Sequence, residues 1–319
     1  MSNDHDMEAD ELPPIPEFDA KRTRRAVRRG ILRTAIVVVA LLVLVPAAVV
    51  TGSSLLQMRG DRGLRMLDVA GTALRVAYPG LHIEVGECCD TDVTSMSFTV
   101  TLSPRRAMGA FFTGRGFGGV TRTIEQDFFG RLSPVPLDAG SMGTTLNQAL
   151  SYIGRDINPK EEMRRVLKNL PKSLNGLAVV EFTRPLTSQE LSAFAKKHDA
   201  CAGQVVYERA PGSTPITWSE DYRTIAYPND GFGEGGAMCS ERSEEVLKDF
   251  RFWVEKRTDH DAVNIGRVGL KFERLRKAAK EGLAYGFVAS HAVERLASML
   301  EDPAVRTIRL ADAQFDLNR

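Results

Sequence analysis

The hydrophobic positions of the sequence change their spacing along the chain, and near the N-terminus they form an unbroken run. No charged residue occurs between Thr34 and Met58, and AIVVVALLVLVPAAVV fills the centre of this 25-residue stretch. A helix of that length is roughly 37 Å long, whereas the hydrocarbon core of a bilayer is about 30 Å thick. We therefore expect a transmembrane helix over residues 35–57, in which Pro46 is tolerated because membrane helices accept proline more readily than soluble ones.

After this run the spacing becomes helical and then alternating. Apolar residues recur every three or four positions between Gly60 and Tyr78, which predicts a helix there. The segments LHIEV and SMSFTVTL alternate between apolar and polar residues and indicate two strands. The glycine-rich residues 108–145 predict short strands and turns, and two further helices are predicted over 145–157 and 159–170.

The C-terminal half contains two similar units of strand, helix and strand. In the first, GLAVVEF is a continuous apolar strand, and Thr187 with Glu190 forms a capping box that begins the helix SQELSAFAKKH before the strand QVVYERA. The second consists of GLAYGFVAS, HAVERLASMLED and AVRTIRLADA, and helical patterns over 243–257 and 268–282 lie between the two units. This order predicts an α+β fold, in which split βαβ units of the ferredoxin type place helices on one face of a small sheet.

Charge is distributed unevenly at the start of the chain. Residues 1–20 carry seven acids and no base, and residues 21–33 carry no acid and seven bases, namely Lys21, Arg22, Arg24, Arg25, Arg28, Arg29 and Arg33. Because Lys and Arg remain on the cytoplasmic side of a membrane, we expect a cytoplasmic N-terminus, with these bases setting the topology and contacting lipid headgroups. The alternative is a cleaved secretory signal peptide, although its charged region would be unusually long.

The overall composition narrows the class of protein. Among 319 residues, 42 Lys and Arg balance 41 Asp and Glu, so we expect no direct binding to nucleic acid. A hydrophobic content of 43% suffices for folded cores. The expected organisation is a cytoplasmic tail (1–34), a transmembrane helix (35–57), a membrane-proximal exterior region (58–165) and a C-terminal α+β domain (166–319). Such a protein resides in the cell membrane as a single-pass protein with its bulk outside the cytoplasm.

All four cysteines fall in the part expected outside, where disulfides persist. Cys201 with Cys239 is the simplest pairing, and the adjacent Cys88 and Cys89 then pair with each other, stay free or bind elsewhere. The sequence contains no Cys-x-x-Cys, and no histidine stands three to five residues from another. We therefore expect structural thiols and neither a metal nor another cofactor.

Two further groups of residues have the composition of catalytic sites. Asp259-His260-Asp261 lies between two helical patterns and is interpreted as a solvated connector. Ser290-His291 lies where a strand becomes a helix, a position at which Ser290 fits the N-cap, and no Gly-x-Ser-x-Gly surrounds it. We therefore expect a protein that is not an enzyme.

The acidic N-terminal segment cannot fold alone, because its large apolar anchors are only Leu12, Ile15 and Phe18. Such a segment can become ordered on a basic surface of a partner. The alternative is a solubilising tail without a partner.

Two sets of residues in the C-terminal half, together with Trp218 after the second strand, match a family pattern over roughly residues 165–315. The first set is Val180, Glu181, Phe182, Pro185, Leu186, Thr187, Glu190 and Leu191. The second set is Tyr285, Gly286, Val288, Glu294, Leu296, Val305, Ile308, Leu310 and Asp312. In these residues the C-terminal half resembles the bacterial sigma factor regulator family of membrane anti-sigma proteins. The N-terminal part resembles the same family in its layout of a basic segment, one span and then strands.

The resemblance implies sequestration of an extracytoplasmic-function sigma factor, an RNA polymerase subunit, at the membrane. The exterior domains of such a protein respond to envelope conditions or to a second membrane regulator. The chain departs from the family at Ser290, where glycine is usual, and in a cytoplasmic part too short for a folded sigma-binding domain. That part also lacks the His-x3-Cys-x2-Cys set of zinc anti-sigma proteins, so capture would use a peptide that orders on binding, a partner or both. The alternative function is a bitopic cell-envelope scaffold or ligand-binding protein without a sigma factor.

Overall fold

The structure is a computed structural model that describes residues 20–58, 61–107, 119–135, 143–219 and 239–315. The chain divides into two compact units, residues 1–53 and 54–319, which are described separately. The long helix α1, Ala20–Met58, contains the predicted span 35–57 together with the basic segment before it. Every residue of α1 up to Val50 is exposed, including the large apolar side chains, so no protein surface covers this part of the helix.

The residues after α1 form the helix and the strands that the spacing predicts. The helix is continuous through α2 (Arg62–Met66), a π-helical turn η1 (Leu67–Gly71) and α3 (Thr72–Ala77). It packs on an antiparallel sheet whose strand order is β1-β2-β3. The strands are β1 (Leu81–Thr91), β2 (Ser95–Pro104) and β3 (Val120–Asp127). In β2 the buried positions alternate because the described residues cover only one face of this sheet.

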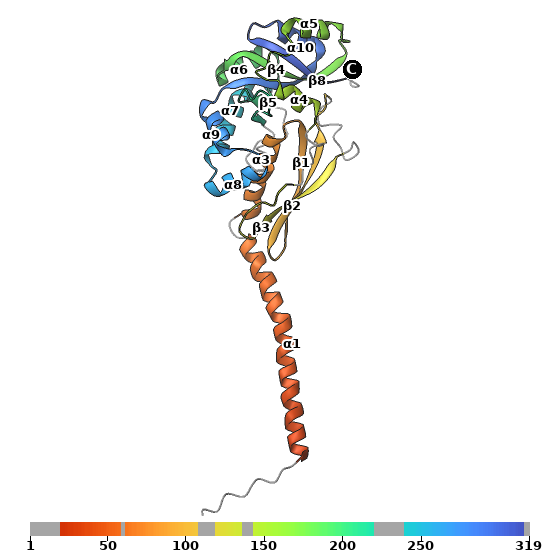
Figure 1. Ribbon diagram of the computed structural model, residues 1–319, viewed down its shortest axis with the longest axis vertical. Coiled ribbons are helices and arrows are strands. Elements are labelled where there is room, and N and C mark those ends of the chain that lie inside the picture. The colour runs from red at the N-terminus through yellow and green to blue at the C-terminus, as the bar shows by residue number, and fades with distance from the viewer. Residues whose placement is uncertain (1–19, 59–60, 108–118, 136–142, 220–238, 316–319) are drawn as a thin grey trace, which may run out of the picture. The chain divides into compact units, whose positions relative to one another are not determined.

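The C-terminal half contains a five-stranded antiparallel sheet of order β6-β5-β7-β4-β8 (Figure 1). Its strands are β4 (Leu174–Leu186), β5 (Gln204–Val206), β6 (Thr217–Ser219), β7 (Ala284–Ala292) and β8 (Val305–Phe315). Helix α6 (Ser188–His198) connects β4 to β5, and α10 (Val293–Glu301) connects β7 to β8. Since β7 lies between β4 and β5, and β4 lies between β7 and β8, both connections are split βαβ units, as the sequence predicts.

Strand β4 is buried on both faces, which explains its uninterrupted apolar sequence. Val180 and Phe182 belong to the core that contains residues of α6 and α10. Leu177 and Val179 belong to a second core on the opposite face, which is covered by α4 (Thr145–Ser151). Figure 1 shows α6 and α10 on one side of the sheet and α4 on the other, so one short helix covers the second face.

Four more helices of this unit lie within the described residues. They are α5 (Lys160–Asn169), α7 (Cys239–Glu255), α8 (Asp259–Arg267) and α9 (Phe272–Glu281). The Trp218 ring packs against Phe250 and Trp253 of α7. The Trp253 indole N–H donates a hydrogen bond to the Asp68 carbonyl at 3.2 Å. One hydrophobic core therefore contains residues from both sides of residue 165, and the predicted domain boundary there stays a prediction.

The structure corrects three local interpretations. Asp259-His260-Asp261 is no connector, because Thr258 caps the N-terminus of α8 and these residues form its first turn. Ser290 lies within β7, and the N-cap of α10 is Ala292. The Ser290 hydroxyl donates instead to the Ala107 carbonyl at 2.9 Å. The predicted strand QVVYERA is also shorter, since β5 ends at Val206.

Candidate functional site

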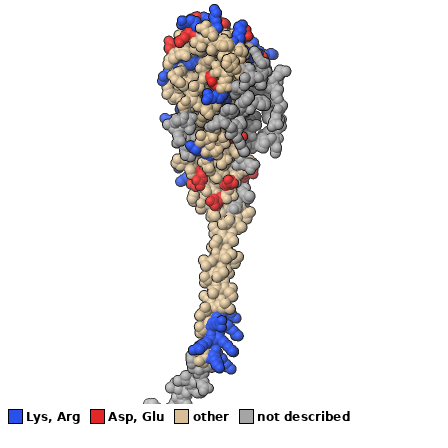
Figure 2. Space-filling model, turned by 90° about the vertical axis from the view of Figure 1, so that its right-hand side faces the viewer, with Lys and Arg blue, Asp and Glu red and all other residues tan. Residues whose placement is uncertain are grey.

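The first candidate site is the basic end of α1. The seven bases of residues 21–33 lie within its first turns and are exposed, and Figure 2 shows them gathered at one end of the helix. With 3.6 residues per turn they occupy about half of the helix circumference, whereas Ala26, Val27, Gly30 and Ile31 share the other half. Among the described helices, only α1 is long and apolar enough to cross a membrane.

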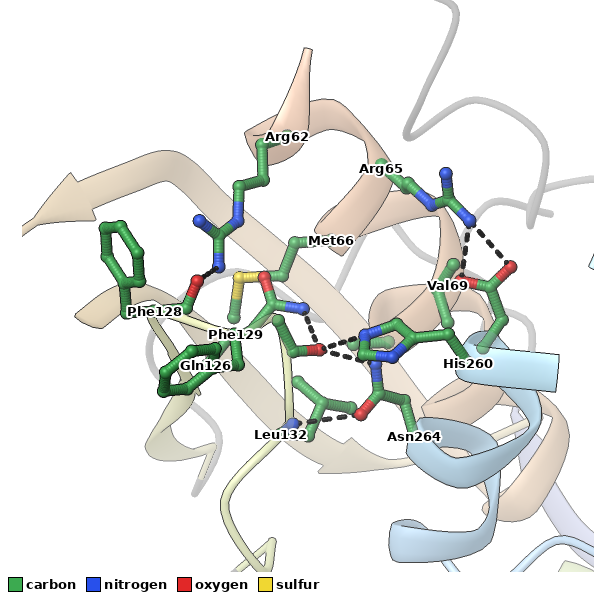
Figure 3. Close-up of a pocket in the computed structure, with 13 residues that line it drawn as sticks. Arg62, Arg65, Met66, Val69, Gln126, Phe128, Phe129, Leu132, His260 and Asn264 are labelled. Atoms are coloured by element: carbon green, nitrogen blue, oxygen red, sulfur yellow. Dashed lines mark hydrogen bonds and ion pairs between the residues drawn. The ribbon is translucent and has the colours of Figure 1, made fainter. Parts of the chain in front are cut away.

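The second candidate site is a cavity of about 500 Å³ in the unit formed by residues 54–319. It lies between the helix α2–η1, the turn that follows β3, and α8 (Figure 3). The buried side chains of Met66, Val69 and Leu132 give it an apolar floor. Polar groups from all three elements surround that floor, so the cavity combines both kinds of surface that a small-molecule site needs.

The carbonyl oxygen of Gly130 holds the turn after β3 in place. It accepts hydrogen bonds from Gln126 Nε2 at 2.7 Å, Asn264 Nδ2 at 2.8 Å and His260 Nε2 at 3.0 Å. Because a carbonyl only accepts, His260 donates this hydrogen bond through its Nε2–H. Gly130 has φ +81°, and a Cβ there would lie 3.0 Å from His260 Nε2, so the turn requires glycine.

Two arginines of α2 stand at the mouth of the cavity in different charge environments. Arg65 pairs with the buried Asp261 carboxylate at 3.1 Å, and Asp261 also accepts hydrogen bonds from Thr258. Burial raises the pKa of Asp261, but the hydrogen bonds from Thr258 and Arg65 outweigh it, so this pKa lies below its ordinary value. The charge of Arg65 is therefore largely compensated within the protein.

Arg62 is bound in a different way, through neutral acceptors. Its guanidinium donates to the carbonyl oxygens of Asp127, at 2.9 Å, and of Phe128, and lies 5.7 Å from the Phe128 ring centroid. No carboxylate of the described residues forms an ion pair with it. Arg62 consequently brings a positive charge to the cavity that the described protein does not neutralise.

Gln126 supplies an unsatisfied acceptor at the cavity wall. The residue is 7% exposed, and its Oε1 has no hydrogen-bond partner among the described residues, although its Nε2 is bonded to Gly130. A buried polar atom without a partner is unfavourable, by about 1–3 kcal/mol. The cavity therefore offers a guanidinium for an anion, and its wall contains a buried amide oxygen that lacks a donor among the described residues.

The structure places the cysteines only in part. Cys88 and Cys89 form a disulfide with each other, and Cys88 Sγ lies 3.6 Å from the Gly63 carbonyl oxygen in α2. Cys201 is disulfide-bonded as well, but the side chain of Cys239 lies outside the described residues, so their pairing stays a prediction. Within the described ranges no group of three or more Cys, His, Asp or Glu side chains could hold a metal ion.

The remaining predicted residues lie elsewhere. Leu12, Ile15 and Phe18 fall outside the described residues. The cavity itself was not predicted from the sequence, since its walls come from residues more than 130 positions apart. One signal was present, because Thr258-x-x-Asp261 has the same spacing as the capping box at Thr187 and marks a helix start.

Comparison with models of protein families, with curated proteins and with solved structures gave no match.

Proposed function

We propose that this chain is a single-span membrane regulator of the anti-sigma type. In this proposal residues 1–34 lie in the cytoplasm and hold an extracytoplasmic-function sigma factor away from core RNA polymerase, and residues 58–319 lie outside and respond to the envelope. The observation that carries it is one uncovered apolar helix with seven bases and no acid at its N-terminal end, followed by a folded unit. Such a layout connects a short cytoplasmic peptide to an exterior domain through a single segment.

The residues that carry the family resemblance have identifiable positions in the fold, and these support the proposal. Thr187 and Glu190 form the capping box that begins α6. Gly286 lies in β7 directly against the Val180 carbonyl of β4, where a Cβ would overlap that oxygen. Glu181 is fully buried between two strands and pairs with the buried Arg309 at 2.6 Å. Each of them stabilises or shapes the split βαβ unit.

The partner is inferred from the resemblance and from the chemistry of the tail. The segment 1–20 is acidic and carries few apolar anchors, so it cannot fold by itself. A segment of this kind becomes ordered when it wraps a basic surface and inserts its apolar side chains into a groove. We assign Leu12, Ile15 and Phe18 as those anchors on the sigma factor.

The test is recovery of the sigma factor with the affinity-tagged full chain from solubilised membranes. Recovery of an RNA polymerase sigma factor with the parent chain, and its loss from the variant Leu12→Ser/Ile15→Ser/Phe18→Ser, are the expected results. The matched control is a chain in which the other residues of 1–20 are rearranged while the three anchors and all acids keep their positions; it should retain capture.

Two outcomes would contradict the proposal. One is recovery of no sigma factor with any form of the chain. The other is equal recovery with a chain that lacks residues 1–33, since sigma-factor binding would then not involve the tail. Membrane retention without any sigma factor would favour the envelope scaffold instead.

A further inference from the structure

One residue that lines the cavity between α2–η1, the turn after β3 and α8 follows closely on α1 in sequence, so it lies within a short reach of the bilayer if α1 spans the membrane. Helix α1 ends at Met58, and Arg62 at the mouth of the cavity follows only four residues later. Four residues extend over at most about 14 Å. This limit comes from the length of the chain alone and holds for any orientation of the folded unit.

The turn after β3 carries exposed aromatic side chains of the kind that is typical of such a location. Phe129 is 76% exposed and is the most exposed large apolar side chain of the described residues outside α1. It makes an edge contact with Phe128, which is itself partly exposed and touches Arg62. Aromatic and aliphatic side chains beside basic residues are typical of surfaces that insert into the headgroup region of a bilayer.

The polar groups of the cavity complement one headgroup chemistry. Arg62 offers a positive charge without a carboxylate partner among the described residues, and a guanidinium is well suited to a phosphate. Gln126 Oε1 is a buried acceptor that needs an O–H or N–H donor. Asp61 precedes Arg62 and limits the net positive charge at this end of α2.

We propose that this cavity binds the headgroup of an anionic glycerophospholipid that carries free hydroxyl groups. The phosphate lies against Arg62, a headgroup hydroxyl that enters the cavity donates to Gln126 Oε1, and the Phe128–Phe129 turn inserts among the acyl chains. The lipid belongs to the leaflet that the C-terminal end of α1 reaches. The inference rests on the membrane insertion of α1 in the proposed function, and it is independent of the sigma factor.

The test uses the full chain in nanodiscs and a fluorescent reporter at the turn. Phe129→Trp places an indole there, and the parent chain, whose Trp218 and Trp253 are buried, supplies the background to subtract. The discs contain acyl-brominated phosphatidylcholine, alone or with phosphatidylglycerol. We expect quenching of the added indole to be at least threefold stronger in the discs with phosphatidylglycerol.

Two substitutions in the Phe129→Trp background identify the cavity as the cause. Arg62→Gln should remove most of the effect of phosphatidylglycerol, whereas Arg131→Gln, which removes the same charge from an exposed position of the same turn but does not line the cavity, should preserve it. Gln126→Met keeps the side-chain volume, removes the acceptor together with the Nε2 donor to Gly130, and should weaken the effect. Thermal unfolding of each variant shows whether the unit remains folded. If Arg62→Gln does not remain folded, the quenching of Gln126→Met decides the test.

The results that would overturn the inference are distinct from failure of the proposed function. Equal quenching in both kinds of disc, or equal loss with Arg62→Gln and Arg131→Gln, would exclude a specific headgroup site. A further such result is that soluble glycerol phosphate abolishes quenching of the indole at position 129 in discs of phosphatidylcholine alone. That result would assign the cavity to a dissolved ligand instead of a lipid headgroup. Extraction of the parent chain from vesicles by carbonate would instead refute the membrane insertion on which both proposals depend.

Discussion

Asp302 joins two elements through three hydrogen bonds. Its carboxylate accepts from Lys197 Nζ at 2.7 Å and His198 Nε2 at 2.8 Å at the end of α6, and from the Ala304 amide at 2.8 Å. Burial raises the pKa of Asp302, but these hydrogen bonds outweigh it, and the pKa lies at about 2. The charged carboxylate is therefore the form that the folded state stabilises.

This lowered pKa predicts how stability depends on acid. The contribution is complete above the ordinary Asp pKa of 3.8 and is lost as the pH falls toward about 2, because the unfolded chain takes up the proton first. We expect the urea midpoint of the full chain to decrease between pH 4 and pH 2, and Asp302→Asn to flatten part of this slope. Asp259→Asn, at a fully exposed carboxylate, should keep the parent slope. An unchanged slope in Asp302→Asn would contradict the assignment.

At the scale of elements, two glycines predict opposite effects of the same substitution. A Cβ on Gly286 in β7 would overlap the Val180 carbonyl of β4, whereas a Cβ on Gly266 in α8 would meet nothing within 4 Å. Gly286→Ala must separate two central strands and should destabilise the unit by at least about 2 kcal/mol. Gly266→Ala should instead stabilise it by about 0.5–1 kcal/mol, because the unfolded chain loses freedom.

Urea unfolding of the two variants beside the parent chain measures both effects. Equal midpoints for Gly286→Ala and the parent would mean that β4 and β7 do not approach each other as described. A destabilised Gly266→Ala would mean that α8 is packed more tightly on that side than the structure indicates.

The sequence predicts those elements whose signals are local. The capping box at Thr187, the alternation in β2 and the continuous apolar strand β4 all depend on neighbours a few residues away, and all are found in the structure. Asp259-His260-Asp261 was misinterpreted because the helix it begins is short and lies between two longer patterns. The cavity could not be predicted, since the contact of Asn264 with Leu132 and Gly130 depends on tertiary packing over more than 130 residues.

For the whole molecule, the arrangement of charge around α1 predicts its orientation. Seven bases precede the apolar stretch and few follow it, so the N-terminus should remain in the cytoplasm. A phosphatase that is active only outside the cytoplasm should be active when fused after Arg319. Replacing the seven bases with glutamine should lower that phosphatase activity several-fold. The control, in which each arginine becomes lysine and Lys21 becomes arginine, keeps the charge and should keep the activity. Fluorescence of a cytoplasmic reporter at the same position would contradict this topology.

The pairing of Trp253 with Asp68 also has a consequence for biosynthesis. The two residues are 185 positions apart, and Arg257 bonds to the same aspartate. At a ribosomal rate of about 5–20 residues per second, roughly 10 to 40 s separate the appearance of one partner from that of the other. Throughout that interval η1 lacks the C-terminal residues that it contacts in the folded chain, so part of its apolar surface is open to a holding chaperone.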